Sequence, residues 1–285
     1  MPPTTDCHIR TLRPDEVELT LELAAHEGWN PGLHDAACFA AADAQGFLVA
    51  ERDGRTLGCI SAVRYGDAFG FIGLYIVVPD CRGQGIGWQL WQQGMQRLQG
   101  RRVGLDGVPA QQPNYRKSGF TLAWQNMRYA GTASGPTGQP EPGIVPLAQA
   151  DWAAVCASDA RVFPAPREAF LKAWCGMPDA SALACLDGPR LAGWGVIRRC
   201  QQGHKIAPLV ADTPEVAERL YAALTARVPA GDAVFLDVPL PNADAVALAT
   251  RHGLQGVFET ARMYTGAAPA CALSQVYGVT SFELG

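Results

Sequence analysis

The chain has 285 residues, of which 48% are hydrophobic and 18% are charged, and its formal net charge is −4. This length and apolar content suit two folded domains and argue against a disordered chain. The acidic balance without a basic run disfavours a nucleic-acid partner, and no apolar run approaches the length of a membrane span.

The nine cysteines are odd in number and scattered, and no Cys-x-x-Cys pair occurs among them. This pattern indicates neither a disulfide framework nor a zinc site, so no metal is expected. The first residues, Met-Pro-Pro-Thr-Thr-Asp, have no signal-peptide pattern. We therefore expect a cytoplasmic protein without a membrane partner.

The first 65 residues predict a strand, two helices and a hairpin. Pro14 and the acids that follow it are typical of a helix start, and Asn30-Pro31-Gly32 predicts a turn between the helices. The expected elements are a strand at 7–13, helices at 14–27 and 34–42, and strands at 46–51 and 57–65.

A glycine-rich turn follows, between an apolar strand and an amphipathic helix. Residues 70–78 are rich in β-branched and aromatic residues, which predicts a strand, and apolar residues recur at helical spacing from Trp88 onward. Between them, Arg82-Gly83-Gln84-Gly85-Ile86-Gly87 has glycine at alternate positions. Backbone amides at the start of the helix can then approach an anion closely, where the helix dipole favours negative charge. The sequence therefore predicts a phosphate site at residues 83–88.

The turn differs from two other phosphate-binding motifs. It has no Lys followed by Ser or Thr, which a P-loop requires, and no third glycine of a dinucleotide-binding fingerprint. The pattern Arg82-x-x-Gly85-x-Gly87, after a strand ending in Val-x-Pro, instead resembles the acyl-CoA pyrophosphate loop of the GNAT N-acetyltransferase superfamily. The alternative is a tight strand–helix connection that binds no ligand.

A second segment carries the same resemblance. Residues 103–108 predict a strand, and Tyr115-Arg116-Lys117-Ser118-Gly119-Phe120 follows it. In GNAT enzymes a helix ending in Tyr-x-Lys-x-Gly-Phe follows this strand, and its Tyr meets the CoA sulfur. An Asn that many members carry seven positions earlier is replaced here by Val108, and Pro109 and Pro113 predict a short or irregular helix. The alternative for Tyr115 is a side chain that only packs at a helix end.

Composition divides the chain into residues 1–131, a linker rich in Gly, Pro, Ser and Thr at 132–143, and residues 144–285. The last part repeats features of the first, since Leu105-Asp106 and Met127-Arg128-Tyr129 have counterparts in Leu236-Asp237 and Arg262-Met263-Tyr264. We therefore expect two tandem GNAT-like α/β domains. Each would be a twisted mixed sheet flanked by helices, and a strand at 121–129 would close the first.

The second half lacks the glycine-rich turn. Thr213-Pro214-Glu215 stands in its place, where Cβ atoms line the turn, an acid opposes a pyrophosphate, and Asp212 or Thr213 caps a helix. The position of Tyr115 falls at Ala249 or Thr250. This half resembles the degenerate C-terminal half of tandem GNAT proteins, so one acyl-CoA per chain is expected, in the first half.

The resemblance implies roles for residues on the cofactor side. The backbone of Tyr75, Ile76 and Val77 would pair with the acyl-CoA arm, and one of their amides would polarise the thioester carbonyl. Tyr115 would protonate the departing thiolate. The pyrophosphate would be held by Arg82, Gly83, Gln84, Gly85, Ile86, Gly87 and Trp88, with Arg82 adding charge or fixing the loop.

On the acceptor side, the resemblance points to the turn after the first helix. Trp29 would stack on the acceptor and Asn30 would hydrogen-bond to it, with Asp106 nearby. Asp106, His26 and Glu27 are candidates for the general base, as is a chain of waters. Each residue also has a purely structural interpretation: Trp29 covers the core, Asp106 caps a turn, and the other two are solvated.

These features predict an N-acetyltransferase that moves acetyl from acetyl-CoA to the primary amine of a small molecule, by direct attack in a ternary complex. The protein would be a monomer or a homodimer. One alternative is a peptide N-terminal, protein N-terminal or lysine acetyltransferase, and another is a non-catalytic acyl-CoA-binding regulatory protein. The final apolar run, residues 276–285, predicts an ordered strand, for which docking across the domain boundary is one placement.

Overall fold

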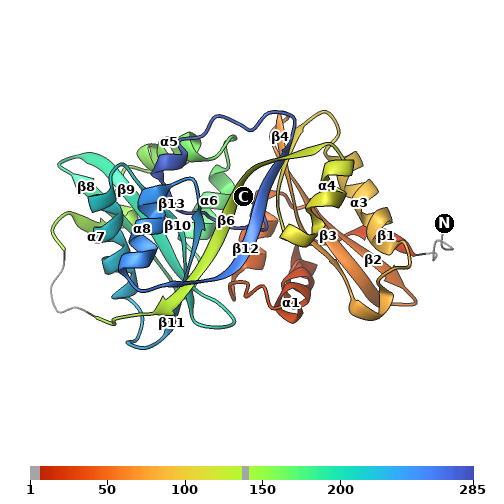
Figure 1. The fold of residues 1–285 in the computed structure, drawn as a ribbon, viewed down its shortest axis with the longest axis horizontal. Coiled ribbons are helices and arrows are strands. Elements are labelled where there is room, and N and C mark those ends of the chain that lie inside the picture. Colours follow the sequence, from red (N-terminus) through yellow and green to blue (C-terminus); the bar gives the residue numbers. More distant parts are fainter. Residues whose placement is uncertain (1–6, 137–140) are drawn as a thin grey trace.

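Two α/β halves share one continuous mixed sheet in the computed structural model, which describes residues 7–136 and 141–285 (Figure 1). Residues 1–6, which are the stretch Met-Pro-Pro-Thr-Thr-Asp without a signal-peptide pattern, lie outside the described residues, as do residues 137–140 of the predicted linker. Within the described ranges, no helix is both long and apolar enough to cross a bilayer.

The first half contains the elements that the sequence predicts, in the same order. After the strand at Arg102–Gly107, a single turn of 3₁₀ helix, η3 (Pro109–Gln111), precedes a helix of only 6 residues, which confirms the short, irregular helix. The strands are β1 (His8–Thr11), β2 (Phe47–Arg52), β3 (Arg55–Tyr65), β4 (Phe69–Val77), β5 (Arg102–Gly107) and β6 (Phe120–Thr132). The helices are α1 (Glu18–His26), α2 (Asp35–Ala42), α3 (Ile86–Arg97) and α4 (Gln112–Lys117).

The second half repeats this order. Its strands are β7 (Ile144–Pro146), β8 (Ala180–Asp187), β9 (Arg190–Arg199), β10 (His204–Ala211), β11 (Ala233–Pro239), β12 (Gln255–Thr265) and β13 (Val276–Gly278). Its helices are α5 (Trp152–Val162), α6 (Glu168–Cys175), α7 (Pro214–Thr225) and α8 (Ala243–Arg251).

The long strands β6 and β12 are exchanged between the halves. The sheet order is β4-β5-β12-β6-β11-β10, so β12 of the second half lies between β5 and β6. Figure 1 shows β12 beside β6 at the centre of the molecule. The expectation that strand 121–129 closes the first half is therefore wrong, because β6 pairs with β12 and β11. Two buried ion pairs join directly opposed residues across this exchange: Asp106 with Arg262, and Asp237 with Arg128.

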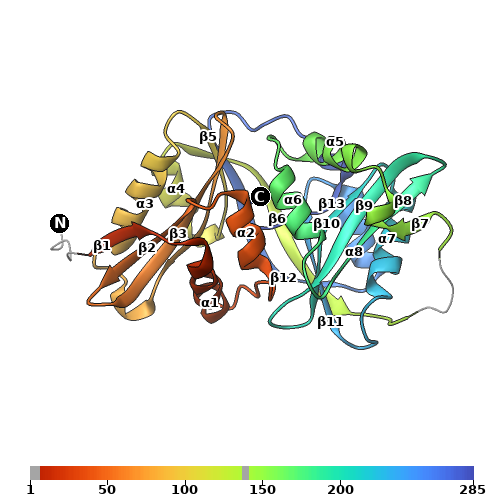
Figure 2. The same ribbon diagram turned by 180° about the vertical axis from the view of Figure 1, so that it is seen from behind.

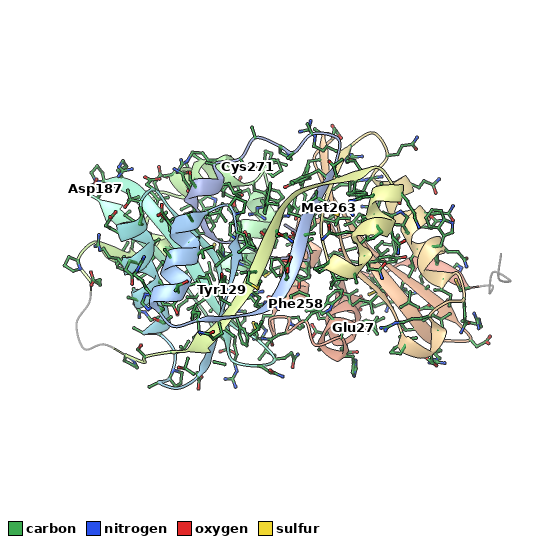
Figure 3. All side chains as sticks on the ribbon, viewed as in Figure 1. Glu27, Tyr129, Asp187, Phe258, Met263 and Cys271 are labelled. Carbon is green, nitrogen blue, oxygen red and sulfur yellow. The ribbon has the colours of Figure 1, made fainter. Side chains whose placement is uncertain are left out.

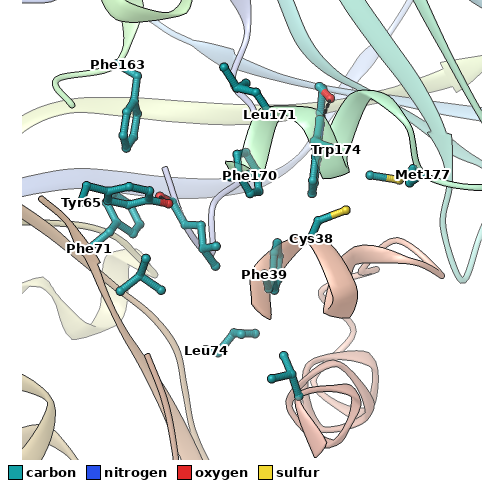
Figure 4. Close-up of a cluster of buried hydrophobic side chains, with 14 of the residues drawn as sticks. Cys38, Phe39, Tyr65, Phe71, Leu74, Phe163, Phe170, Leu171, Trp174 and Met177 are labelled. Atoms are coloured by element: carbon teal, nitrogen blue, oxygen red, sulfur yellow. Dashed lines mark hydrogen bonds between the residues drawn. The ribbon is translucent and has the colours of Figure 1, made fainter. Parts of the chain in front are cut away.

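A hydrophobic cluster continues the junction on the other side of the molecule, where α2 faces α6 (Figure 2). The Phe39 ring is stacked with Trp174 at a centroid distance of 6.2 Å, and Tyr65 meets Phe163 edge-on at 4.9 Å (Figure 4). Burying aromatic surface from both halves in one cluster stabilises their arrangement. The halves thus share a core as well as a sheet.

The last ten residues cross the junction. β13 pairs antiparallel with β10 of the second half, and the segment then reaches the first half, where the Tyr65 hydroxyl donates to the carbonyl oxygen of Leu284 at 3.0 Å. The expectation of a strand holds for Val276–Gly278 only. The remaining residues are buried without strand pairing, and the segment docks across the boundary.

Candidate active site

A cleft opens where β4 and β5 diverge. Their parallel pairing covers Phe69 to Ile72, and β4 then bulges at Leu74, whose φ is 46°. The β3–β4 register shifts at the same place. The bulge turns the next residues away from the β5 pairing, and a cavity of about 540 Å³ lies there. Tyr75, Ile76 and Val77 all line this cavity, as the sequence predicts for the residues that meet the acyl-CoA arm.

The glycine-rich turn forms one end of the cavity. Gly83 and Gly85 have φ of 75° and 82°, which side chains rarely adopt, and Gly85 is the N-cap of α3. A Cβ at Gly87 would lie 2.8 Å from the Tyr75 hydroxyl. The glycine backbone and the helix N-terminus together fit a pyrophosphate group.

Side chains of the turn divide between the cavity and the protein. Trp88 is 59% exposed and lines the cavity mouth, whereas Ile86 is fully buried and does not line it. Gln84 donates to the carbonyl oxygen of Asp80. Arg82 donates to the carbonyl oxygen of Val77 at 2.9 Å and pairs with Glu27. Of its two expected roles, the contacts of Arg82 match that of fixing the loop to the end of β4.

Tyr115 lies deep in the same cavity. Its ring is 5.5 Å from that of Trp91 and 6.4 Å from that of Phe120, and a Cβ at Gly107 would overlap it. Burial, reinforced by the nearby Tyr75, raises the pKa of Tyr115 above its ordinary value, and burial raises the pKa of Tyr75 to about 12. Both phenols therefore stay protonated at neutral pH and are available as proton donors.

Two of the predicted acceptor-side residues line the cavity, and one does not. Trp29 lines it, and its carbonyl oxygen accepts a hydrogen bond from Arg128 at 2.7 Å. Asn30 is directed to the second half, where its side chain exchanges two hydrogen bonds with the backbone of Gln202. Asp106 lines the cavity, but Arg262 holds both of its carboxylate oxygens, at 2.8 and 2.6 Å.

None of the three side chains considered as a base is both free and in the cavity. Glu27 is paired with Arg82, and His26 is not among the cavity-lining residues. Burial raises the pKa of Asp106 although Arg262 opposes the rise, and Asn126 donates a further hydrogen bond to it at 2.8 Å. These contacts give Glu27 and Asp106 structural roles.

The second half walls part of the cavity, through residues that the sequence alone did not identify. Phe258 and Thr260 on β12 line the cavity, together with Phe282 and Glu283 from the final segment. Arg128, from the exchanged strand β6, lies 5.7 Å from the Phe258 ring and 5.2 Å from the Phe282 ring. Phe258 and Glu27 mark the junction of the halves in Figure 3. Phe258, Thr260 and Arg262 alternate along the sequence, so they share one face of a strand, and this pattern could have indicated that they line a site together.

The corresponding cleft of the second half is occupied by the chain itself. β10 and β11 pair in parallel only from His204 to Ile206, and β13 pairs with β10 beyond that point. The amide of Val279 also donates to the carbonyl oxygen of Asp237 on β11 at 2.8 Å. Thr213 caps α7 by accepting from Val216, as expected of a turn without glycine. The second cleft therefore differs from the first in both its turn and its contents.

Metal ligands do not gather at this site. Across residues 7–136 and 141–285, no group of three or more His, Cys, Asp or Glu side chains is placed to hold a metal ion.

Both halves match one protein family. Residues 12–120 match the Acetyltransferase (GNAT) family, and residues 155–278 match an Acetyltransferase (GNAT) domain. The chain therefore belongs to the GNAT acetyltransferase family, with two GNAT domains in tandem, and it is an acyltransferase.

One curated relative is similar over nearly the whole chain. Holothin acyltransferase from Pseudoalteromonas sp. (strain SANK 73390) is 30% identical over 271 residues, which cover 95% of this chain and 92% of the relative.

Solved structures extend the likeness at the level of the fold. A protein from Pyrococcus horikoshii assigned as an acetyltransferase has a TM-score of 0.82 at 22% identity, covering 98% of this chain and 96% of its own. A tandem GNAT protein from the clavulanic acid biosynthesis pathway has a TM-score of 0.63 at 14% identity, covering 92% and 100%.

Proposed function

We propose that this protein transfers an acetyl group from acetyl-CoA to the primary amine of a small molecule, by direct attack in a ternary complex. The observation that carries the proposal is a single cavity that joins the glycine-rich turn, the protonated Tyr115 and an acceptor end walled by both halves. Catalysis belongs to the first half in this proposal, and the second half completes the acceptor end.

The residues of the first half divide the work. The amides that begin α3 hold the pyrophosphate, and the β4 backbone from Tyr75 to Val77, unpaired with β5, aligns the thioester and polarises its carbonyl. The bound acyl-CoA supplies the activated acyl group. Tyr115 gives its phenolic proton to the departing sulfur, since burial keeps that phenol protonated.

A small acceptor is favoured over a peptide by the walls of the acceptor end. Trp29, Arg128, Phe258 and Phe282 surround it from both halves. The relative with 30% identity is named Holothin acyltransferase, which makes holothin an acceptor to include in the test. A peptide or protein acceptor is the first alternative, and a regulatory acyl-CoA-binding protein without turnover is the second.

The test is a screen of acceptors scored by free-thiol release from acetyl-CoA, repeated with longer acyl-CoA thioesters. Holothin, alkylamines, aromatic amines and short peptides form the panel. Release with small amines and none with peptides supports the proposal. Preference for peptides would favour the first alternative, and acyl-CoA binding without release to any acceptor would favour the regulatory one.

The cytoplasmic location and the monomeric or homodimeric state remain predictions. Light scattering of the purified chain would measure the mass in solution and decide between one and two copies.

A further inference from the structure

Glu283, in the final segment of the chain, is an acidic residue among those that line the cavity. Its residue is only 6% exposed, and it lines the cavity together with Phe282. A Cβ at Gly73 would overlap the backbone carbonyl of Glu283, so the segment lies directly against β4. Gly73 precedes Leu74, where the β4 bulge begins. Glu283 is thus beside the backbone that the proposed function assigns to the thioester.

Three carboxylates line the cavity, and two of them are held by arginines. Glu27 pairs with Arg82 and Asp106 pairs with Arg262. Glu283 has no salt bridge with any residue in the described ranges, and the Ser281 hydroxyl donates its one side-chain hydrogen bond, at 2.6 Å. A buried carboxylate without a counter-ion is costly unless a positive group binds there.

The negative charge of Glu283 contributes to raising the pKa of Asp106 on β5, of Arg128 on β6 and of Arg198 on β9. Each of them is already engaged, with Arg262, Asp237 and Asp35 respectively. Neither arginine forms a salt bridge with Glu283, so a cationic ligand would supply a direct partner for its carboxylate.

The segment that carries Glu283 is held on both sides. Asn242 donates to the carbonyl oxygen of Val276 in β13 at 2.9 Å. Arg167 donates to Thr280 at 2.9 Å and to the backbone oxygen of Gly285 at 2.7 Å. Anchors before and after Glu283 restrict its motion, which is what a preorganised binding or catalytic group needs.

We propose that Glu283 receives the ammonium group of the acceptor and takes one of its protons. This inference rests on the proposed function. The carboxylate accepts the proton, and the freed nitrogen lone pair forms the C–N bond while the thioester C–S bond breaks. Tyr115 protonates the sulfur, the second nitrogen proton restores the phenol through solvent, and Glu283 releases its proton to solvent. One proton leaves for each acyl group transferred.

This role defines the class of acceptor. Alkylamines are cationic at neutral pH and need both a counter-ion and a base before they can attack. Aromatic amines are neutral at pH 7 and need neither. Glu283 should therefore select for alkylamines and matter little for aromatic amines.

The test compares Glu283→Gln with Glu259→Gln. The glutamine keeps the shape of Glu283 and can still accept from Ser281, but it has no charge. Glu259 is the matched control, since it lies on β12 between two cavity-lining residues, does not itself line the cavity, and accepts from Gln125. Thermal unfolding and acetyl-CoA affinity, measured by calorimetry, check that each variant folds and keeps the cofactor site.

For an alkylamine, Glu283→Gln should lower kcat/KM by about 10²- to 10⁴-fold, the usual range for a lost general base. The deficit should shrink as the pH rises, because more of the amine is then neutral in solution. The variant should also bind the alkylamine more weakly in the presence of CoA. Activity towards an aromatic amine should change little, and Glu259→Gln should match the wild type.

Two failures are distinguishable. A wild-type protein that releases no thiol with any amine contradicts the proposed function and, with it, this role. A wild-type protein that acylates alkylamines while Glu283→Gln does so equally well contradicts only the role of Glu283. A deficit that is equal for both amine classes and at every pH also overturns it, because that result indicates a structural effect.

Discussion

The two clefts of this protein have the same strand geometry, but the first is a cavity and the second is filled by the chain itself. In the first, parallel pairing of β4 and β5 ends at Ile72, and in the second, pairing of β10 and β11 ends at Ile206. Both β4 and β10 carry a register irregularity near that point. The first cleft is a cavity with a glycine-rich turn, whereas the second holds β13. The gap beyond the paired strands is therefore open to a ligand in the first half, whereas strand β13 of the same chain occupies it in the second half.

The exchange of β6 and β12 ties the halves together symmetrically. Each half provides an aspartate for an arginine of the other, since Asp106 faces Arg262 and Asp237 faces Arg128. The repeated Leu-Asp motifs therefore supply the aspartates of these pairs, and the arginines come from the Met-Arg-Tyr and Arg-Met-Tyr motifs. The second half is thus part of the cavity, and the same segment that fills its cleft continues to Glu283.

The largest expected effect comes from replacing Tyr115, a residue that the second half does not have. Tyr115→Phe should lower kcat by about 10²- to 10⁴-fold, because the sulfur loses its proton donor. Acetyl-CoA affinity should stay nearly unchanged, since the turn is untouched. Steady-state kinetics of thiol release and calorimetry measure the two quantities.

Thr250→Val is the control, at one of the two positions of the second half, Ala249 and Thr250, that the sequence matches to Tyr115. Its hydroxyl donates to the carbonyl oxygen of Val246 on the surface of α8, so activity should match the wild type. Equal turnover of Tyr115→Phe and wild type across the pH range would contradict the role of Tyr115 as the acid.

A second substitution loosens the segment that fills the second cleft. Tyr277 in β13 is 1% exposed and packs in the second-half core, so Tyr277→Ala should lower the free energy of unfolding by about 3–4 kcal/mol. Val257→Ala removes an exposed apolar side chain of β12 and should change it by less than about 0.5 kcal/mol. Urea unfolding measures the free energy of unfolding of both variants, and equal values would contradict close packing of β13 in the second cleft.

The smallest expected effect concerns acid stability. Burial opposes the charge of Asp35 and Asp237, but Arg198 and Arg128 hold the pKa of each carboxyl below its ordinary value. A lowered folded-state pKa means that this stabilisation is present above the unfolded pKa, about 3.9, and is lost as the pH falls below it. Urea unfolding between pH 7 and pH 3 should show the loss.

Asp35→Asn removes one of these carboxylates and gives the comparison for the acid series. The variant should be less stable at pH 7, where it leaves Arg198 buried without its partner, and its stability should fall less steeply with acid. A slope identical to that of the wild type would show that Asp35 does not contribute to it.

The local features of this protein could be predicted from its sequence. The glycine spacing, the flanking strand and helix, and Tyr115 are short-range patterns, and the structure brings them to one cavity. Thr213 as a helix cap is another, because capping depends on a few neighbouring residues. These patterns suffice to predict the element order and which residues of the first half meet at the glycine-rich end of the cavity.

The acceptor side depends on pairings that no local pattern reveals. Strand exchange puts Phe258 and Arg128 at the cavity. The sequences of β12 and β6 would read the same if each strand paired within its own half. Asp106 looks like a candidate base in the sequence because its partner, Arg262, lies 156 residues away and no local pattern reveals the ion pair. Glu283 left one signal, a single acid in an otherwise uncharged apolar run at residues 276–285.

The most direct test of the difference between the clefts is a calorimetric titration with acetyl-CoA. We predict one site per chain, and Gly87→Leu should weaken its affinity by about 100-fold, or about 2.8 kcal/mol, because its side chain enters the turn beside Tyr75. Glu215→Ala, in the matching turn of the second half, should leave both stoichiometry and affinity unchanged. Two sites per chain, or binding that Gly87→Leu does not weaken, would contradict the assignment of the cofactor to the first half alone.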